Sequence, residues 1–397
     1  MKPNLFFLLL LFAGCGKDPV NPPADPYVKI SISDVSMAEG NSGTTVFPFS
    51  VTLEKAQSQE VVVNYNTMEM SAKAGEDFEA VSNGVLRFAP GETEKKININ
   101  VVTDTNREGD DEFQVKLTST NIGMFAKGSG KGTIVNDDES LNISNEGYDA
   151  PTNYTGYQLA WSDEFNGNSL DLSSWSFENG DGCPNICGWG NNELEYYTDR
   201  PQNLFFQDGK LVIEARKESY NGKNYTSSKI LTRGKKVMKY GRIDVRAKLP
   251  RGRGIWPAIW MMPQSSVYGG WPKSGEIDIM EMLGHEPSKV YGTVHYGPGP
   301  GSTQISRPYS LSSSSFYDQF HVFSLEWSQD ELKWYVDNQL FSTVKKADVG
   351  SNTWPFNEEF YMIINLAVGG NWPGNPDANT SFPQWMILDY VRAYKQG

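Results

Sequence analysis

Short runs in which hydrophobic and polar residues alternate recur along almost the whole chain. In its first part these runs occupy residues 28–32, 45–51, 61–65, 97–101 and 113–117. Alternation with a period of two is typical of strands that bury one face, and the Gly-, Pro- and Asn-containing clusters between the runs provide turns. About seven short strands in residues 27–138 therefore predict a small β-sandwich.

The remainder of the chain shows the same strand pattern on a larger scale, with little helical periodicity. Strand-like runs occupy residues 211–215, 241–247, 321–327, 332–336, 361–365 and 386–391. Residues 157–397 therefore predict one large antiparallel sandwich. Residues 139–156, between the two regions, form a polar stretch with little apolar periodicity, which predicts a linker. The predicted fold class is all-β.

The first residues have the pattern of an export signal. A charged start precedes an apolar run in residues 5–12, which is far shorter than the roughly 20 residues of a membrane-spanning helix. The sequence Phe-Ala-Gly-Cys that ends at Cys15 resembles a bacterial lipoprotein signal. The resemblance implies removal of residues 1–14, lipidation of Cys15, and anchoring to a bacterial membrane, either the outer membrane or the cell surface. Residues 15–26, which are proline-containing and have no apolar run, predict a flexible tether. Simple secretion is the alternative.

Charge and cysteine content exclude several classes of protein. The 397 residues include 35 basic and 48 acidic ones, and a net charge of −13 argues against a nucleic-acid-binding protein with a clustered basic face. All 11 tryptophans lie between Trp161 and Trp385, so the two predicted regions differ in composition. Three cysteines and three histidines exclude a zinc ribbon and a disulfide-dense scaffold. In an exported protein Cys183 and Cys187 could close a small disulfide loop, and two unpaired thiols are the alternative.

Acidic residues gather in the turns of the first region, as at residues 76–77, 108–112 and 137–138. Loops at one end of a sandwich can supply the oxygen ligands that calcium needs, but acidic loops also serve solubility. The segments that resemble the Calx-beta domain are residues 38–40, 74–78, 88–93, 108–113 and 132–138. This resemblance implies an immunoglobulin-like sandwich, which binds calcium in some members and is a spacer in others.

The residues with the most reactive side chains form one short acidic stretch, residues 275–282, with the sequence GEIDIMEM. Side chains alternate along a strand, so Glu276 and Asp278 share one face while the isoleucines face the core. A regular strand would bury Glu281, and a lone buried carboxylate is costly. One extra residue near Met280, a β-bulge, returns Glu281 to the acidic face, and bulges are frequent beside active sites.

Three carboxyl groups on one strand face predict acid–base chemistry on a glycosidic bond. Carboxyl groups about 5–5.5 Å apart serve a retaining glycosidase and groups about 6.5–9.5 Å apart an inverting one, and a single strand favours the shorter separation. Close carboxylates cannot all ionise easily, so one stays protonated as an acid while another is charged as a nucleophile. A solvated acidic edge and a catalytic Mg²⁺ or Ca²⁺ cluster are the alternatives.

Further segments in the same order along the chain resemble a known enzyme family. The segments are residues 161–165, 189–198, 240–250, 254–260, 276–281, 293–295 and 365–374. Through them, residues 159–395 resemble glycoside hydrolase family 16, in particular its laminarinase-like endo-β-1,3-glucanases. The resemblance implies a β-jelly-roll whose concave sheet forms an open catalytic cleft. It also implies that Glu276 is the nucleophile, Glu281 the acid/base catalyst and Asp278 the residue that assists the nucleophile.

The same resemblance suggests which residues bind substrate and metal. The implied substrate-binding residues are Asn191, Trp256, Trp260, His295 and Trp372. Flat tryptophan faces can line a groove and stack on sugar rings, although each tryptophan taken alone is more typical of a core. The implied ligands of a structural calcium ion, away from the cleft, are Glu164 and Gly209 through backbone oxygens and Asp389 through its carboxylate.

The sequence therefore predicts a retaining endoglycosidase that hydrolyses β-1,3-glucan through a glycosyl-enzyme intermediate. It predicts no cofactor for catalysis, structural calcium in the larger region, and a calcium-binding role for the first region as an open alternative. The same chemistry on mixed-linkage β-glucan or a marine galactan is one alternative function, and a non-catalytic carbohydrate-binding surface protein is another. A monomer is expected, with a polysaccharide substrate, no nucleic-acid partner, and membrane contact only through the lipid anchor.

Overall fold

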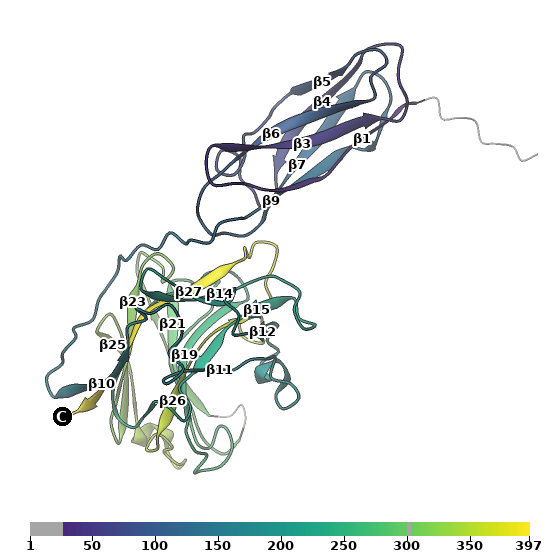
Figure 1. Cartoon of the computed structure of the whole chain (residues 1–397). Coiled ribbons are helices and arrows are strands. Elements are labelled where there is room, and N and C mark those ends of the chain that lie inside the picture. Colours follow the sequence, from purple (N-terminus) through teal and green to yellow (C-terminus); the bar gives the residue numbers. More distant parts are fainter. Residues whose placement is uncertain (1–26, 300–302) are drawn as a thin grey trace, which may run out of the picture. The chain divides into compact units, whose positions relative to one another are not determined.

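The computed structural model of the protein describes residues 27–299 and 303–397, and residue contacts divide the chain into two compact units (Figure 1). The first unit runs up to Asp104 and resumes with Asp110–Asp137, and the second contains Thr105–Gly109 and Asp138–Gly397. The predicted signal, the tether and Cys15 lie outside the described residues. Within the described residues, no helix is long and apolar enough to cross a membrane.

The first unit is a sandwich of two β-sheets, as the alternating runs predict. One sheet has the strand order β6 (Glu94–Val102), β3 (Thr44–Leu53), β1 (Lys29–Ile32) and β8 (Met124–Lys127). The other has the order β2 (Val35–Ala38), β9 (Ser129–Val135), β7 (Asp111–Thr120), β4 (Val61–Glu69) and β5 (Gly84–Phe88). Neighbouring strands are antiparallel except in the β1–β8 and β2–β9 pairs, which are parallel.

Phenylalanine rings fill the space between these two sheets. Phe113 on β7 packs against Phe78, Phe47 and Phe49, with ring centroids 4.7, 6.0 and 5.8 Å apart. Gly132 on the neighbouring strand β9 has to lack a side chain, because a Cβ atom there would lie 2.5 Å from the Phe113 ring. This close packing explains why a glycine occupies a position in the middle of a strand, where no turn requires one.

The second unit is a sandwich of two larger sheets (Figure 1). The back sheet has the order β13 (Leu204–Gln207), β14 (Lys210–Ala215), β27 (Gln384–Gln396), β18 (Gly241–Lys248), β23 (His321–Trp327), β24 (Glu331–Val336) and β25 (Gln339–Lys345), with β10 (Tyr157–Asp163) also paired to β27. The cleft sheet has the order β11 (Ser176–Phe177), β16 (Lys229–Leu231), β26 (Phe360–Val368), β19 (Ile255–Pro263), β20 (Glu276–Met282), β21 (Lys289–His295) and β22 (Gln304–Ser310), with β17 (Val237–Met238) also paired to β26.

Smaller elements complete this second unit. They are the parallel pair β12 (Glu195–Tyr197) and β15 (Tyr225–Ser227) and the short 3₁₀ helices η1 (Cys187–Gly190) and η2 (Lys346–Val349). The predicted all-β class and the jelly-roll sandwich are confirmed.

One hydrophobic core joins the back sheet to the cleft sheet and supports the acidic strand β20. Ile243 on β18 and Ile277 on β20 are both buried in this core. Trp334 on β24 of the back sheet donates its indole N–H to the backbone oxygen of Asp278 at 2.8 Å. Gly292 on β21 leaves room for this indole, since a Cβ atom there would lie 2.5 Å from the Trp334 ring. The position of β20 is therefore set from beneath by a rigid aromatic side chain.

Residues 139–156, predicted to be a linker, lie along the second unit instead. Leu141 and Ile143 pack on a buried cluster of that unit, and Arg246 donates from Nε to the backbone oxygen of Tyr148 at 2.7 Å. Single apolar residues at irregular spacing produce no periodic signal in the sequence, which is why the segment resembled a solvated linker. Its contacts make it part of the larger unit.

Candidate active site

The acidic strand β20 contains a β-bulge where the sequence predicts one. The chain advances three residues from Asp278 to Glu281, whereas their partners on β21 are only two residues apart. The extra residue allows Ile279 and Met280, which are 2% and 0% exposed, to be buried in succession. Glu276, Asp278 and Glu281 therefore all line the same cleft, which a regular strand could not achieve.

Glu276 and Asp278 lie beside a histidine and an indole donor. His295 Nε2 is 3.4 Å from Asp278 Oδ2 and 3.7 Å from Glu276 Oε1. Trp271 donates from Nε1 to Glu276 Oε2 at 2.7 Å, and its ring lies 5.8 Å from the His295 ring. The carboxyl group of Glu276 is therefore oriented from two sides.

Glu281 is held separately, by a different tryptophan. Trp256 on β19 donates from Nε1 to Glu281 Oε1 at 3.2 Å. The Trp256 ring also meets the edge of Trp372 at 5.8 Å, and Trp372 in turn contacts Tyr291 at 5.0 Å. Trp372 is 41% exposed, so part of its ring is open to a ligand. Glu276 and Glu281 lie on the same strand, but each is held by a different tryptophan.

Burial raises the pKa of every carboxyl group in this row, and repulsion by neighbouring charges adds to the effect at Glu276 and Glu281. Burial, followed by the charge of Asp278, raises the pKa of Glu276 to about 8. Burial also raises the pKa of Asp278 to about 8, and burial with the charges of both neighbours raises the pKa of Glu281 well above its usual value. The three groups therefore do not all ionise together at neutral pH, and at least one of them keeps its proton. One ionised carboxylate beside a protonated acid is the state that glycoside hydrolysis requires.

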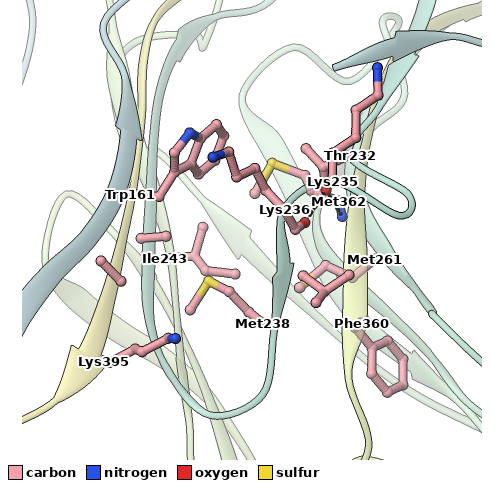
Figure 2. Close-up of a pocket in the computed structure, with 13 residues that line it drawn as sticks. Trp161, Thr232, Lys235, Lys236, Met238, Ile243, Met261, Phe360, Met362 and Lys395 are labelled. Atoms are coloured by element: carbon pink, nitrogen blue, oxygen red, sulfur yellow. Dashed lines mark hydrogen bonds between the residues drawn. The ribbon is translucent and has the colours of Figure 1, made fainter. Parts of the chain in front are cut away.

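The carboxyl groups line a cleft of about 120 Å³ on the outer face of the cleft sheet. Asn191, Trp256 and Trp260 line the same cleft. A larger cavity, of about 220 Å³, lies at the edge of the sandwich and is lined by Trp161, by methionines such as Met238 and by lysines, with no carboxylate (Figure 2). Of these two cavities, it is the cleft that brings carboxyl groups together.

A polar network beneath the cleft contains residues that the sequence reasoning did not single out. Trp260 donates from Nε1 to Asn365 Oδ1 at 2.7 Å, and Asn365 donates from Nδ2 to the Tyr197 hydroxyl at 3.0 Å. Asn191 donates from Nδ2 to Glu193 Oε1 at 3.3 Å. Burial raises the pKa of Glu193. The motif WGNNELEYYT contains Asn191, Glu193 and Tyr197, but only the fold shows that Tyr197 meets Asn365.

The three positions predicted to bind calcium lie near positively charged side chains. The Asp389 carboxylate pairs with Lys210 Nζ at 2.8 Å and with Arg246 Nη1 at 2.6 Å. Glu164 pairs with Arg392 through both oxygens, at 3.0 and 2.8 Å. Gly209 occupies the turn before Lys210 with a φ of +69°. With both oxygens of Asp389 engaged by cations, the arrangement does not fit a calcium ion at that carboxylate, and calcium binding there stays an untested prediction.

Carboxylates also gather in the first unit. Burial raises the pKa of Asp111 on β7, and the negative charges of Asp77 and Asp110 add to the effect. Such repulsion is what a bound cation would relieve. Calcium binding by this unit stays a prediction.

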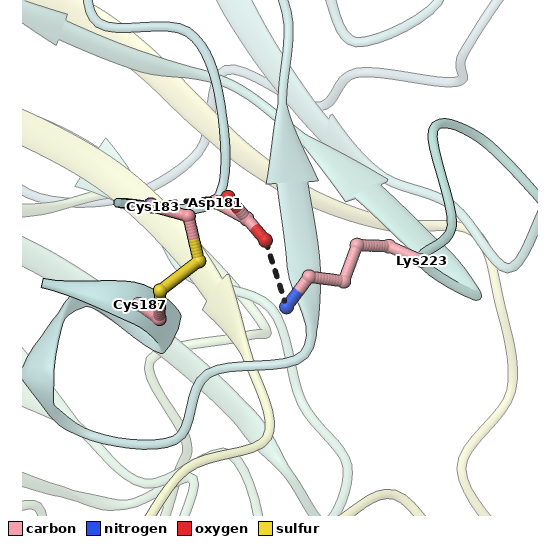
Figure 3. Close-up of a disulfide and its surroundings, with 4 residues drawn as sticks. All are labelled: Asp181, Cys183, Cys187 and Lys223. Carbon is pink, nitrogen blue, oxygen red and sulfur yellow. Dashed lines mark hydrogen bonds and ion pairs between the residues drawn. A yellow bond between two sulfur atoms is a disulfide. The ribbon is translucent and has the colours of Figure 1, made fainter. Parts of the chain in front are cut away.

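The structure joins Cys183 and Cys187 in a disulfide (Figure 3). Asp181, two residues before it, pairs with Lys223 Nζ at 3.5 Å. The disulfide loop leads directly into η1 and then to Asn191, so it adjoins the cleft.

Comparison with known families agrees with the geometry of both units. The sequence profile "Glycosyl hydrolases family 16" matches residues 191–389, and the profile "Calx-beta domain" matches residues 25–139. A further profile, "Beta-glucan synthesis-associated protein SKN1/KRE6/Sbg1", matches residues 96–274. The first two matches fall on the larger and the smaller sandwich.

Individual relatives that match the larger sandwich have names that refer to glucan degradation. "Beta-glucanase" of Rhodothermus marinus is 41% identical over 249 residues, which cover 60% of this chain and 85% of the relative. "Glucan endo-1,3-beta-glucosidase A1" of Niallia circulans is 43% identical over 283 residues, which cover 66% of this chain but only 41% of that relative.

A solved structure shows the same relationship. The laminarinase catalytic domain from Thermotoga maritima MSB8 is 49% identical with a TM-score of 0.58, and the match covers 61% of this chain and 99% of that domain. The matched part is therefore the whole catalytic domain of the laminarinase. Together with the bulged carboxylate strand, these similarities show that the chain belongs to glycosyl hydrolase family 16, with a Calx-beta domain before the hydrolase domain.

Proposed function

We propose that this protein is a retaining endo-β-1,3-glucanase. The observation that carries the proposal is the row of three carboxyl groups on the bulged strand β20, in which Glu276 and Glu281 have separate tryptophan donors. A protein that only binds carbohydrate has no need of this row. The names of the relatives, glucan endo-1,3-β-glucosidase and laminarinase, support β-1,3-glucan as the substrate.

In the first step, the ionised carboxylate of Glu276 attacks the anomeric carbon of the bound glucan. The bond from that carbon to the glycosidic oxygen breaks, and Glu281 gives its proton to the departing oxygen. Burial raises the pKa of Glu281, which keeps its proton in place at neutral pH. The N–H of Trp271, which donates to Glu276, favours the charged form of that carboxyl group.

In the second step, the Glu281 carboxylate takes a proton from a water molecule whose oxygen attacks the anomeric carbon. The ester bond to Glu276 breaks and returns its carboxylate, and Glu281 regains the proton that it gave away. Two displacements on opposite faces of the sugar retain the β configuration. Asp278 and His295 hold the Glu276 carboxyl group in place during both steps.

The deciding experiment measures the release of reducing sugar from laminarin, mixed-linkage β-glucan, agarose and carrageenan. We expect laminarin to be hydrolysed fastest, with the β-anomer appearing first in the proton NMR spectrum. Glu276→Gln and Glu281→Gln should each lose more than about 10³-fold in kcat, and Asp278→Asn should lose less. First appearance of the α-anomer would refute retention, and a preference for agarose or carrageenan would favour the galactan alternative. Binding of laminarin without hydrolysis would favour the carbohydrate-binding alternative.

We also propose that the first unit is a spacer, that the protein acts as a monomer, and that Cys15 carries a lipid that holds the exported protein on a bacterial membrane. Because residues 139–156 pack on the larger unit, a chain that begins at Asp138 should retain turnover within about twofold of the longer protein. Labelling with palmitate should mark the wild type and not the Cys15→Ser variant. An unlabelled wild type would favour the alternative, secretion without a lipid anchor.

A further inference from the structure

The disulfide Cys183–Cys187 closes a short loop (Figure 3). Ile186, within this loop, lines the catalytic cleft. Within the loop, the Ile186 N–H donates to the Gly182 oxygen at 2.8 Å. Gly182 has a φ of +80°, and a Cβ atom there would lie 2.2 Å from the Ile186 oxygen. The loop is therefore folded tightly on itself, and the Asp181–Lys223 ion pair ties its base to the neighbouring segment.

The backbone after Cys187 adopts left-handed conformations that residues other than glycine rarely adopt. Gly188, Trp189 and Asn192 have φ values of +61°, +51° and +58°. A left-handed conformation costs a residue other than glycine about 1 kcal/mol or more. The surrounding hydrogen bonds hold it in place, since the Asn191 and Glu193 N–H groups both donate to the Gly188 oxygen, at 2.9 and 3.0 Å. The covalent closure and these bonds together determine where the Trp189 ring lies.

Two side chains of this segment face the cleft. Ile186 and Trp189 line the same cavity as the three carboxyl groups. Ile186 is 54% exposed, so its side chain is open to a ligand in the cleft that it lines. The Trp189 ring is braced from behind by Tyr197 at 5.6 Å and by Lys229, whose Nζ lies 3.9 Å from the ring centroid. Lys229 is itself neutralised by Glu178 at 2.8 Å, so this wall presents little net charge.

We propose that the disulfide-closed loop is a specificity-determining wall of the cleft, on which Ile186 and Trp189 contact a glucosyl ring of the bound glucan. This inference rests on the proposed function and adds a dependence of substrate affinity on the disulfide. A neutral, partly apolar wall suits the faces of uncharged sugar rings. The disulfide keeps the two side chains in their binding positions, so the loop loses little conformational freedom when the substrate binds.

The test compares steady-state kinetics on laminarin for the wild type, a Cys183→Ser/Cys187→Ser variant and Ile186→Ser. We expect both variants to show KM raised by about tenfold, with kcat unchanged within about twofold, because the catalytic carboxyl groups are supported elsewhere. Dithiothreitol, which reduces the disulfide to two thiols while forming its own cyclic disulfide, should raise the KM of the wild type in the same way. It should have no further effect on the double-serine variant. Cys15→Ser is the matched control and should behave as the wild type.

Several results would overturn the inference while leaving the proposed function intact. One is a KM within twofold of the wild type in both variants. Another is a loss confined to kcat and melting temperature, which would make the disulfide only a structural brace. If the wild type itself releases no sugar from laminarin, the proposed function fails. Binding of laminarin, followed by affinity electrophoresis in native gels, then tests the wall separately, and equal retardation of all variants would refute it.

Discussion

Replacing Trp271 by phenylalanine removes one hydrogen bond from the proposed nucleophile while keeping an aromatic ring in place. The indole donates to Glu276 Oε2 at 2.7 Å, and a donor stabilises the ionised carboxylate over the neutral acid. A hydrogen bond to a charged group contributes about 1.5–3 kcal/mol. Trp271 is 45% exposed, so water compensates for part of this loss and we take about 1 kcal/mol. That free energy corresponds to a rise of roughly 0.7 in the pKa of Glu276.

The expected consequence is a shift of the acidic limb of the profile of kcat/KM against pH. The nucleophile has to be ionised, so activity is lost as the pH falls through its pKa, and a higher pKa moves that limb upward by roughly 0.7 pH unit. At a pH below the pKa of Glu276, kcat/KM of the Trp271→Phe variant should be about fivefold lower than that of the wild type. Trp260→Phe is the matched control, because it removes an indole donor from the same cleft whose acceptor is the Asn365 amide, which does not titrate. An acidic limb that stays in place, or one that moves equally in both variants, would refute the reasoning.

Three further predictions follow from the charges of the same domain. Azide should restore turnover to Glu276→Ala by forming an α-glycosyl azide, since a small anion can replace the missing nucleophile; no rescue together with full activity of the variant would place the nucleophile elsewhere. Burial raises the pKa of Glu276 from 4.5 to about 8, so its contribution to stability is present at acidic pH and lost as the pH rises through about 8. Glu276→Gln cannot ionise, and its melting temperature should exceed that of the wild type by a few degrees at about pH 9 and match it at about pH 4. Since Lys210 and Arg246 neutralise Asp389, chelation should change the melting temperature of a chain that begins at Asp138 by less than about 2 °C. A larger fall that added calcium reverses would show that the ion displaces Lys210.

The bulge in β20 illustrates how far sequence reasoning extends into the site. The residue order around Glu281 already conflicts with a regular strand, because a lone carboxylate would be buried among isoleucines. This conflict is local, and it predicts the extra residue near Met280 that the register confirms. Trp271 lies only five residues from Glu276, yet its role was missed. The direction of its side chain depends on a loop whose path is set by contacts with the rest of the domain.

The surroundings of Asp389 show the opposite case, in which sequence reasoning did not foresee the local ion pairs. Arg246 and Asp389 are separated by 143 residues, and Lys210 lies on a third strand. Charges that far apart in the sequence meet only because β18, β14 and β27 are neighbours in the back sheet. A charged residue on an apolar strand signals that a partner exists, but not whether the partner is a metal or a side chain.

The amino-acid sequence by itself determined the all-β class, the division into two sandwiches, the row of carboxyl groups on one strand face, and the membership of a glucan-hydrolysing family. These properties depend on spacing between near neighbours, which the period of a strand translates directly into a buried face and an exposed one. The tertiary structure alone decided that residues 139–156 pack on the larger unit, that Trp271 and Trp256 hold the two glutamates, and that the Cys183–Cys187 loop reaches the cleft. Those contacts join segments that are distant in the sequence, and their free energy is gained only when both sheets have closed over one core.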